Sequence, residues 1–124
     1  MWSANSDPGR QLLELDFSGR VTADEARACS ARVQELLPQL SPGFTLLTDL
    51  SEVEDMDLSC EPIIDKVMDT LNAHGVHKVV RIVPAPEKDI GFGIMSLFHY
   101  SPRVRVVTCE TVAEAQSHLP SVTR

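Results

Sequence analysis

Five carboxylates lie within ten residues of one another in the middle of the chain: Glu52, Glu54, Asp55, Asp57 and Glu61. Clustered carboxylates can attract a basic surface of another protein, and several oxygens together can bind a hard cation such as Ca²⁺. The spacing of an EF-hand calcium loop is absent. Acidic residues also gather at exposed helix N-termini, where the helix dipole favours negative charge. Two interpretations therefore stand side by side, a docking surface for a protein partner and an ordinary helix start, and we expect no bound metal.

Two further reactive side chains, Ser59 and Cys60, belong to the same stretch. A phosphate on Ser59 would accept hydrogen bonds from free amides at a helix N-terminus, which makes Ser59 a candidate phosphorylation site. The neighbouring carboxylates would repel that phosphate, and the alternative is that Ser59 caps the helix. The helix dipole favours a Cys60 thiolate, whereas the acidic neighbours disfavour it. Because no set of nucleophile, base and orienting group is recognisable, we predict that the chain is not an enzyme and has no catalytic residues.

The remaining cysteines and the histidines are scattered along the chain. Cys29, Cys60 and Cys109 contain no CxxC pair, so the sequence indicates neither a disulfide framework nor a zinc site. The four histidines form no HExxH or HxH pattern. We therefore predict three buried, reduced cysteines and no metal or other cofactor.

The 124 residues carry 18 acidic and 11 basic side chains, which gives a net charge of −7. Binding to a phosphate backbone needs a basic face, so we predict no nucleic-acid partner. No apolar run approaches the roughly 20 residues that cross a bilayer, and the start of the chain lacks the regions of a signal peptide. A chain of this length can bury about two thirds of its unfolded surface. We expect one soluble, cytoplasmic domain over residues 1–124.

Residues 44–84 predict the unit that positions the acidic stretch. The segments FTLLTDL and VHKVVRIVP are apolar and rich in β-branched residues, and EPIIDKVMDTLNAHG between them has a helical period. A helix between two such strands makes a right-handed βαβ crossover with parallel strands. The loop Leu50–Glu61 would then lie at the carboxyl end of the first strand, where α/β sheets usually carry their sites.

The rest of the chain predicts further elements of the same sheet, and their order along the sequence is β-β-α-β-α-β-α-β-α. The fold class is a single α/β domain with a mixed, mostly parallel sheet of four to five strands and about four helices. Gly19 is expected to end the second strand. Strands are predicted at Met1–Ser6, Leu12–Ser18 and Val104–Cys109, and capping boxes begin helices at Thr22 with Glu25 and at Thr111 with Glu114.

A third helix, predicted over Asp89–Tyr100, is apolar on two faces. One face is expected to join the core, and the other either lies beneath nearby loops or contacts another molecule. A dimer face, a partner groove and a lipid-sized pocket are the alternatives for that contact. The side chains that would line such a ligand pocket are Phe92, Met95, Phe98 and Tyr100.

The order of elements, together with four segments, resembles the STAS domain, the fold of bacterial anti-sigma-factor antagonists. The resemblance covers almost the whole chain and rests on LDFSGRVTADEA, LLTDLSEVEDMDLSC, LNAHGVHKVVRIVP and TVAEAQSHL. Antagonists of this family typically carry a D-S-S-G or D-S-T-G motif at the helix start, where this chain has Asp57, Leu58, Ser59 and Cys60. Leu58 stands at the position of the usual phosphorylated serine, Ser59 at the second hydroxyl and Cys60 at the glycine. The segment DIGFGIMSLFHYSPRV is similar to a branch of uncharacterised STAS-like proteins that are grouped with CRAL-TRIO lipid-transfer proteins.

The resemblance implies a non-enzymatic regulatory domain of the bacterial cytoplasm that binds a protein partner, for example a regulatory kinase or an anti-sigma-like protein. We expect charge complementarity to steer the encounter, and apolar contacts near Met56 and Leu58 to hold the complex. The alternative function is a small-molecule or lipid carrier that uses the helix over residues 89–100. The oligomeric state is open, a homodimer included. The predicted partner-binding residues of the loop 51–61 are Glu54, Asp55, Met56, Asp57, Leu58 and Ser59.

Overall fold

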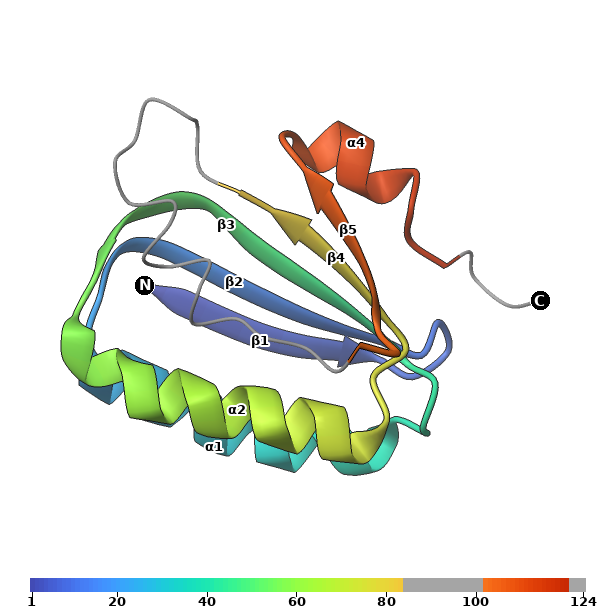
Figure 1. Ribbon diagram of the computed structural model, residues 1–124, viewed down its shortest axis with the longest axis horizontal. Coiled ribbons are helices and arrows are strands. Elements are labelled where there is room, and N and C mark those ends of the chain that lie inside the picture. Colours follow the sequence, from blue (N-terminus) through green and yellow to red (C-terminus); the bar gives the residue numbers. More distant parts are fainter. Residues whose placement is uncertain (84–101, 121–124) are drawn as a thin grey trace.

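The computed structural model describes residues 1–83 and 102–120, which form an α/β fold around one five-stranded sheet (Figure 1). The strands follow the spatial order β1-β2-β3-β4-β5; β1 is antiparallel to β2, and every other neighbouring pair is parallel. The prediction of a mixed, mostly parallel sheet is therefore confirmed. The strand bounds are β1 (Trp2–Asp7), β2 (Leu12–Val21), β3 (Thr45–Met56), β4 (Lys78–Ile82) and β5 (Arg105–Cys109).

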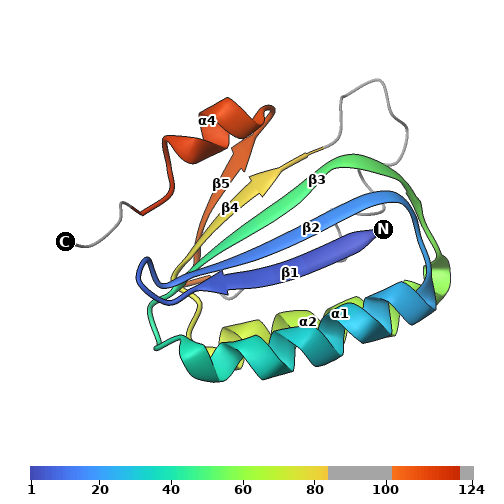
Figure 2. The same ribbon diagram turned by 180° about the vertical axis from the view of Figure 1, so that it is seen from behind.

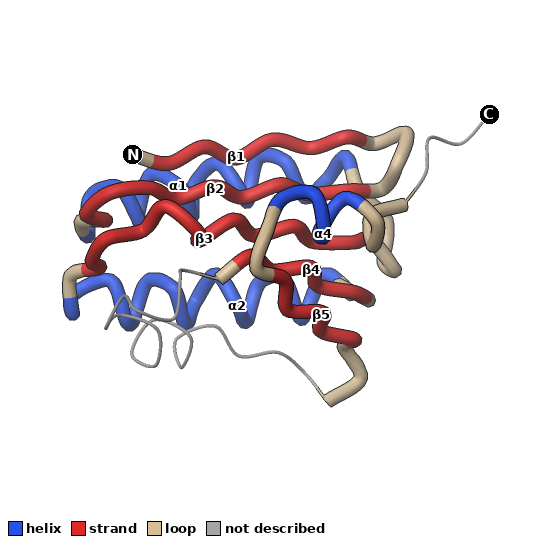
Figure 3. Tube along the Cα trace, turned by 90° about the horizontal axis from the view of Figure 1, so that it is seen from above, coloured by secondary structure: helices blue, strands red, loops and turns tan. Residues whose placement is uncertain are grey.

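Helices cover both faces of the sheet. The helices α1 (Ala23–Leu36) and α2 (Glu61–His74) lie side by side on one face, and the short α4 (Val112–Gln116) lies on the other, as Figures 1 and 2 show from opposite sides. Seen from above in Figure 3, α1 and α2 run along the strands. Two short 3₁₀ helices, η1 (Leu37–Gln39) and η2 (Leu58–Cys60), flank them. The helix predicted over Asp89–Tyr100 lies outside the described residues.

Capping side chains define where two of the helices begin, as the sequence predicted. The Thr22 hydroxyl accepts a hydrogen bond from the Glu25 amide, and the Glu25 carboxylate accepts one from the Thr22 amide. The Thr111 hydroxyl likewise accepts from the Glu114 amide at the start of α4, but the Glu114 carboxylate accepts from the Glu110 amide, so the second predicted capping box is only half formed. Each contact satisfies an amide that the helix itself leaves unpaired.

The larger core lies between the sheet and the pair α1 and α2. The first half of β2 contributes alternate residues to it, β3 contributes Leu46, Leu50, Val53 and Met56, and each helix contributes a stripe at a period of three to four residues. A smaller cluster under α4 contains Val80, Ile82, Cys109 and Ala115. The largest fully buried side chains are Phe17, Phe44, Leu12, Leu13, Leu15, Leu46, Leu50, Ile64, Met68, Leu71, Ile82 and Val21.

The βαβ unit of β3, α2 and β4 is formed as predicted. Strands β3 and β4 pair in parallel from Thr45 with Lys78 to Asp49 with Ile82. Gly75 ends α2 in the left-handed conformation, with φ of 93°. A Cβ atom at Gly75 would also lie 2.9 Å from the Cβ of Pro42, so both backbone conformation and space require glycine here.

Two predicted strand ends are wrong. β2 does not end at Gly19 but continues to Val21, and β3 continues through the acidic residues to Met56. The two strands stay paired over this extra length, from Ser18 with Glu52 to Val21 with Met56, with one register shift just before Ser18 and a second between Gly19 and Arg20. Most of the stretch predicted as a loop is therefore strand, because backbone pairing with β2 continues through it.

Candidate functional site

The acidic stretch forms the end of a two-stranded extension of the sheet. β1 pairs with β2 only as far as Phe17, and β4 pairs with β3 only as far as Asp49. β2 and β3 continue to pair with each other beyond these residues, and Figure 1 shows both strands curving toward the starts of α1 and α2. Along β3, Val53 and Met56 are buried in the core, whereas Glu52, Glu54 and Asp55 are exposed. The fold thus presents these three carboxylates from a paired strand and not from a free loop.

Met56 is buried, whereas the sequence predicted it as a partner contact. Its side chain is only 8% exposed and belongs to the main core, so it supports the extension from beneath. The burial of Met56 gives no support to a partner contact through this side chain, and that contact remains an untested prediction. The register shift between Gly19 and Arg20 on β2 accompanies the change in alternation that turns Met56 inward.

Asp57, which directly follows β3, is held by Arg20 at the end of β2. The Nη2 and Nε atoms of Arg20 lie 2.7 Å and 3.0 Å from Oδ1 of Asp57. The hydrogen bond to Asp57 raises the pKa of Arg20, with a smaller contribution from the charge of Asp55. The Asp57 amide also donates to the Val21 carbonyl at 3.0 Å. Asp57 is thus part of the frame of the site, and its charge is largely balanced within the chain.

The 3₁₀ helix η2 places three consecutive side chains in different surroundings. Leu58 is 88% exposed, Ser59 is exposed and Cys60 is fully buried. Cys60, and not Ser59, is the N-cap residue of α2, and no side chain caps this helix. Among the described residues of the site, Leu58 is the large apolar side chain that lies almost entirely in water, so its surface is available for contact with another molecule.

Cys60 has no feature of a reactive thiol. Its Sγ donates to the Val21 carbonyl at 3.6 Å. Burial, followed by the negative charge of Asp57, raises the pKa of Cys60. A thiol of raised pKa has little thiolate at neutral pH, so the structure assigns Cys60 a packing role.

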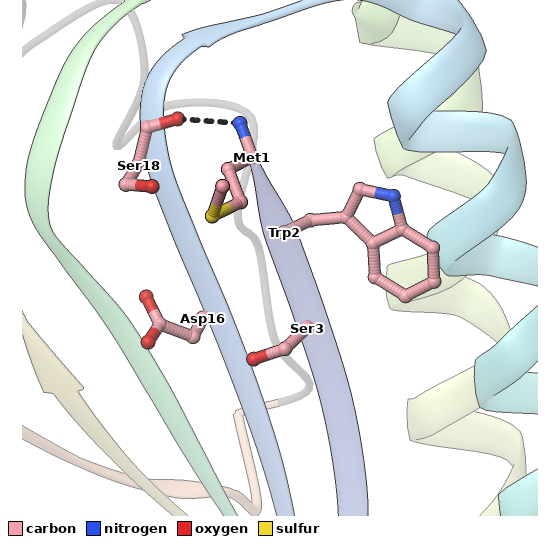
Figure 4. A pocket seen from close by; sticks show the side chains of 5 residues that line it. All are labelled: Met1, Trp2, Ser3, Asp16 and Ser18. Atoms are coloured by element: carbon pink, nitrogen blue, oxygen red, sulfur yellow. Dashed lines mark hydrogen bonds between the residues drawn. The ribbon is translucent and has the colours of Figure 1, made fainter.

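A second group of carboxylates, which the sequence did not indicate, lies on the open face of β2 and β3. Asp16 pairs in register with Asp49, and the pKa of Asp16 is raised by burial and then by the charges of Asp49 and Glu52. A cavity of about 90 Å³ lies beside Asp16, lined also by Ser18 and by the first three residues of the chain (Figure 4). Its volume is well below the roughly 300 Å³ at which small-molecule sites begin.

Other features that could have indicated a site have structural explanations. In the described ranges 1–83 and 102–120, no three His, Cys, Asp or Glu side chains are arranged to hold a metal ion. Nε2 of His74 lies 2.8 Å from the Leu40 carbonyl oxygen, and its ring meets Phe44 edge-on. No helix of the same ranges is long and apolar enough to cross a bilayer. The predicted pocket residues lie outside the described part of the chain; they are Phe92, Met95, Phe98 and Tyr100.

Comparison with solved structures identifies the fold. The anti-sigma factor antagonist SpoIIAA in its unphosphorylated form aligns over 95% of this chain and 96% of its own, with a TM-score of 0.66 and 13% identity. The chain has the SpoIIAA fold. The Bacillus cell fate determinant SpoIIAA in its phosphorylated form aligns over 95% of this chain and 98% of its own, with a TM-score of 0.63 and 15% identity.

An uncharacterised protein of the DUF3478 family from Shewanella loihica PV-4, with a SpoIIAA-like fold, aligns over 96% of this chain and 92% of its own. Its TM-score is 0.65 and its identity 15%. No protein-family model matches the sequence, and no curated protein matches it either. The comparisons confirm the STAS-like fold that the sequence predicted, and the function has to be argued from the residues of the site.

Proposed function

We propose that this chain is a non-enzymatic regulatory domain that binds a protein partner at the end of the molecule formed by η2 and the extension of β2 and β3. The observation that supports this most strongly is Leu58, an apolar side chain that is 88% exposed and has exposed carboxylates on both sides of it in the sequence. Glu54 and Asp55 are exposed before it and Glu61 is exposed after it. On a fold shared with an anti-sigma factor antagonist, this arrangement suits a partner with an apolar pocket and a basic rim.

The two kinds of side chain would contribute differently to the complex. Rim carboxylates such as Glu54 and Asp55 act mainly on the association rate, because they steer a basic surface toward the site. Leu58 would act on the dissociation rate, because its burial in a partner removes apolar surface from water. The paired strands beneath, anchored by buried Val53 and Met56, reduce the entropy lost on binding.

Ser59 is proposed as a point of control over this site. It is exposed and directly follows Leu58, so a kinase could reach its hydroxyl. A phosphate adds a charge of about −1.5 to −2 and could compete with Asp57 for the guanidinium of Arg20. Loss of that ion pair would free the turn that presents Leu58. Phosphorylation by a host lysate, followed by mass spectrometry of wild type and Ser59→Ala, would test whether Ser59 is a substrate.

The proposed function is tested by affinity capture from the native host with matched variants. Leu58→Asp removes the apolar contact, and Asp55→Lys reverses a charge at the rim. Glu110→Lys reverses an exposed charge next to α4, on the other side of the sheet, and serves as the control. We expect wild type and Glu110→Lys to retain the same partner, Leu58→Asp to lose it, and Asp55→Lys to capture less of it because association is slower. An unchanged set of captured proteins for Leu58→Asp would refute docking through this site.

The proposal also assigns the protein to a bacterial cytoplasm, where partners of this kind would be met and where three free, buried cysteines stay reduced. Fractionation of host cells with an antibody against the chain tests this directly. Recovery of the chain in an extracellular or membrane fraction would contradict the assignment.

A further inference from the structure

A groove between α1 and α2 forms a second surface near the proposed docking site. It has a volume of about 360 Å³ and is lined by Arg27 and Gln34 from α1 and by Pro62, Ile63 and Lys66 from α2, among others. Ile63 is partly exposed and packs on the main core, so the floor of the groove is apolar. Two of the lining side chains are basic and none of the described ones is acidic, although the whole chain has a net charge of −7.

Leu58 and this groove are neighbours at the same end of the molecule. The Leu58 carbonyl accepts a hydrogen bond from the amide of Glu61, the residue that precedes Pro62 in the wall of the groove. Leu58 is therefore an exposed apolar knob with carboxylates beside it, and next to it lies a groove of apolar floor and basic rim. The protruding, acidic surface around Leu58 is therefore complementary in shape and charge to the concave, basic surface of the groove.

We propose that a second copy of the chain occupies the groove, with Leu58 of each copy inserted between α1 and α2 of the other. A twofold dimer needs one surface that is complementary to itself, and a knob beside a groove of opposite charge meets this condition. Because Leu58 and the groove are adjacent on the surface, both Leu58 side chains can insert in a single twofold dimer. Such a dimer is closed, so it does not extend into a filament.

The charges of the groove favour this occupant. Lys66 has no ion pair with any described residue, so the carboxylate of a second copy can pair with it. Arg27 is exposed and pairs with Asp24 at 2.8 Å on its own helix, an exposed pair that costs little to rearrange. Apart from Asp57, which pairs with Arg20, the carboxylates nearest to Leu58 in the sequence of the second copy are Asp55 and Glu61. The dimer would cover Leu58 and hence compete with the partner of the proposed function.

Sedimentation equilibrium of the whole chain tests the dimer at concentrations from about 10 μM to about 1 mM, the range in which small interfaces associate. We expect wild type to dimerise in this range. Leu58→Asp and Lys66→Glu should each weaken the dimer by about tenfold or more, as for residues at the centre of an interface. Val112→Asp changes another exposed apolar residue, on α4 across the sheet, and should leave the dimer unchanged.

Circular dichroism would establish that each variant is folded, and Lys66→Glu tests the groove even if Leu58→Asp does not fold. Wild type that stays monomeric over the whole range, or a dimer that Lys66→Glu and Leu58→Asp leave equally stable, would overturn the proposal. Species larger than a dimer would overturn the closed pair. Lys66→Glu also separates the two proposals, because it should weaken the dimer by about tenfold or more and retain the captured partner. A failed partner capture would refute the proposed function and leave the dimer to be judged by sedimentation.

Discussion

Replacing Val53 by alanine tests whether the acidic stretch is a strand packed on the core. Val53 is fully buried between the exposed Glu52 and Glu54. The substitution removes two methyl groups, worth about 0.8 kcal/mol each in transfer free energy, and leaves a small cavity. With the cavity included, we expect a loss of about 2–3 kcal/mol in the free energy of unfolding. For a domain of this size, that lowers the melting temperature by roughly 6–15 °C.

Urea denaturation followed by fluorescence measures this loss, because the single tryptophan, Trp2, packs against the same core and reports its unfolding. The flanking variants Glu52→Ala and Glu54→Ala are the controls and should change the free energy of unfolding by less than about 0.5 kcal/mol. If Val53→Ala cost no more than these controls, the stretch would not be packed on the core and the strand assignment would be refuted.

Three further predictions concern backbone strain, charge and thiols. Gly75→Ala should lower the free energy of unfolding by about 2–4 kcal/mol, because the added Cβ is strained in the left-handed conformation and also meets Pro42. Gly19→Ala, at φ of 66° with open space around it, should lower the free energy of unfolding by only about 1 kcal/mol. Equal losses for the two variants in urea denaturation would contradict this. Partial desolvation, followed by the charges of Asp49 and Glu52, raises the pKa of Asp16 above 3.8. A carboxyl group of raised pKa lowers stability as the pH rises through that pKa. Asp16→Asn should therefore stabilise the fold at about pH 7, by at most about 0.5 kcal/mol because the side chain is exposed, and the gain should vanish in acid; a gain that is independent of pH would exclude this cause. Burial raises the pKa of Cys29 to about 12, and all three cysteines are buried. Iodoacetamide should therefore modify the thiols only in urea and not in the native protein. Rapid modification of the native protein would show that at least one thiol is accessible.

Most of the fold could be predicted because its signals are local. The apolar runs of β3 and β4, the helical stripe between them and the glycine at the end of α2 each depend on a few neighbouring residues. The capping box of Thr22 and Glu25 fixes the start of α1 in the same way. Together these signals define the βαβ unit and hence the direction of its strands.

The extension of β2 and β3 could not be predicted, because nothing local marks it. Glu52, Glu54 and Asp55 are poor strand formers, and the buried Val53 and Met56 are three positions apart, which breaks the alternation expected of a strand. Pairing with β2 overrides these preferences, and the register shifts within that pairing explain the spacing. The strand conformation of the acidic stretch therefore depends on its pairing with β2, which lies far from it in the sequence.

The candidate site was predicted in part. The sequence indicated the exposed carboxylates and Leu58, since their position after a buried strand follows from the βαβ pattern. It missed Arg20, because the pairing of Arg20 with Asp57 depends on the parallel register of β2 and β3. The groove beside Lys66 was missed for a similar reason, as it exists only where α1 and α2 lie side by side.

Photo-crosslinking in host cells is the most direct test of the central claim that Leu58 contacts a protein partner. A photoreactive amino acid would replace Leu58 in one variant and Val112, the exposed apolar residue on α4, in the control. The account predicts a discrete adduct from position 58 with a protein other than a second copy of the chain, and no such adduct from position 112. Absence of this adduct at position 58, or identical adducts from both positions, would contradict the account.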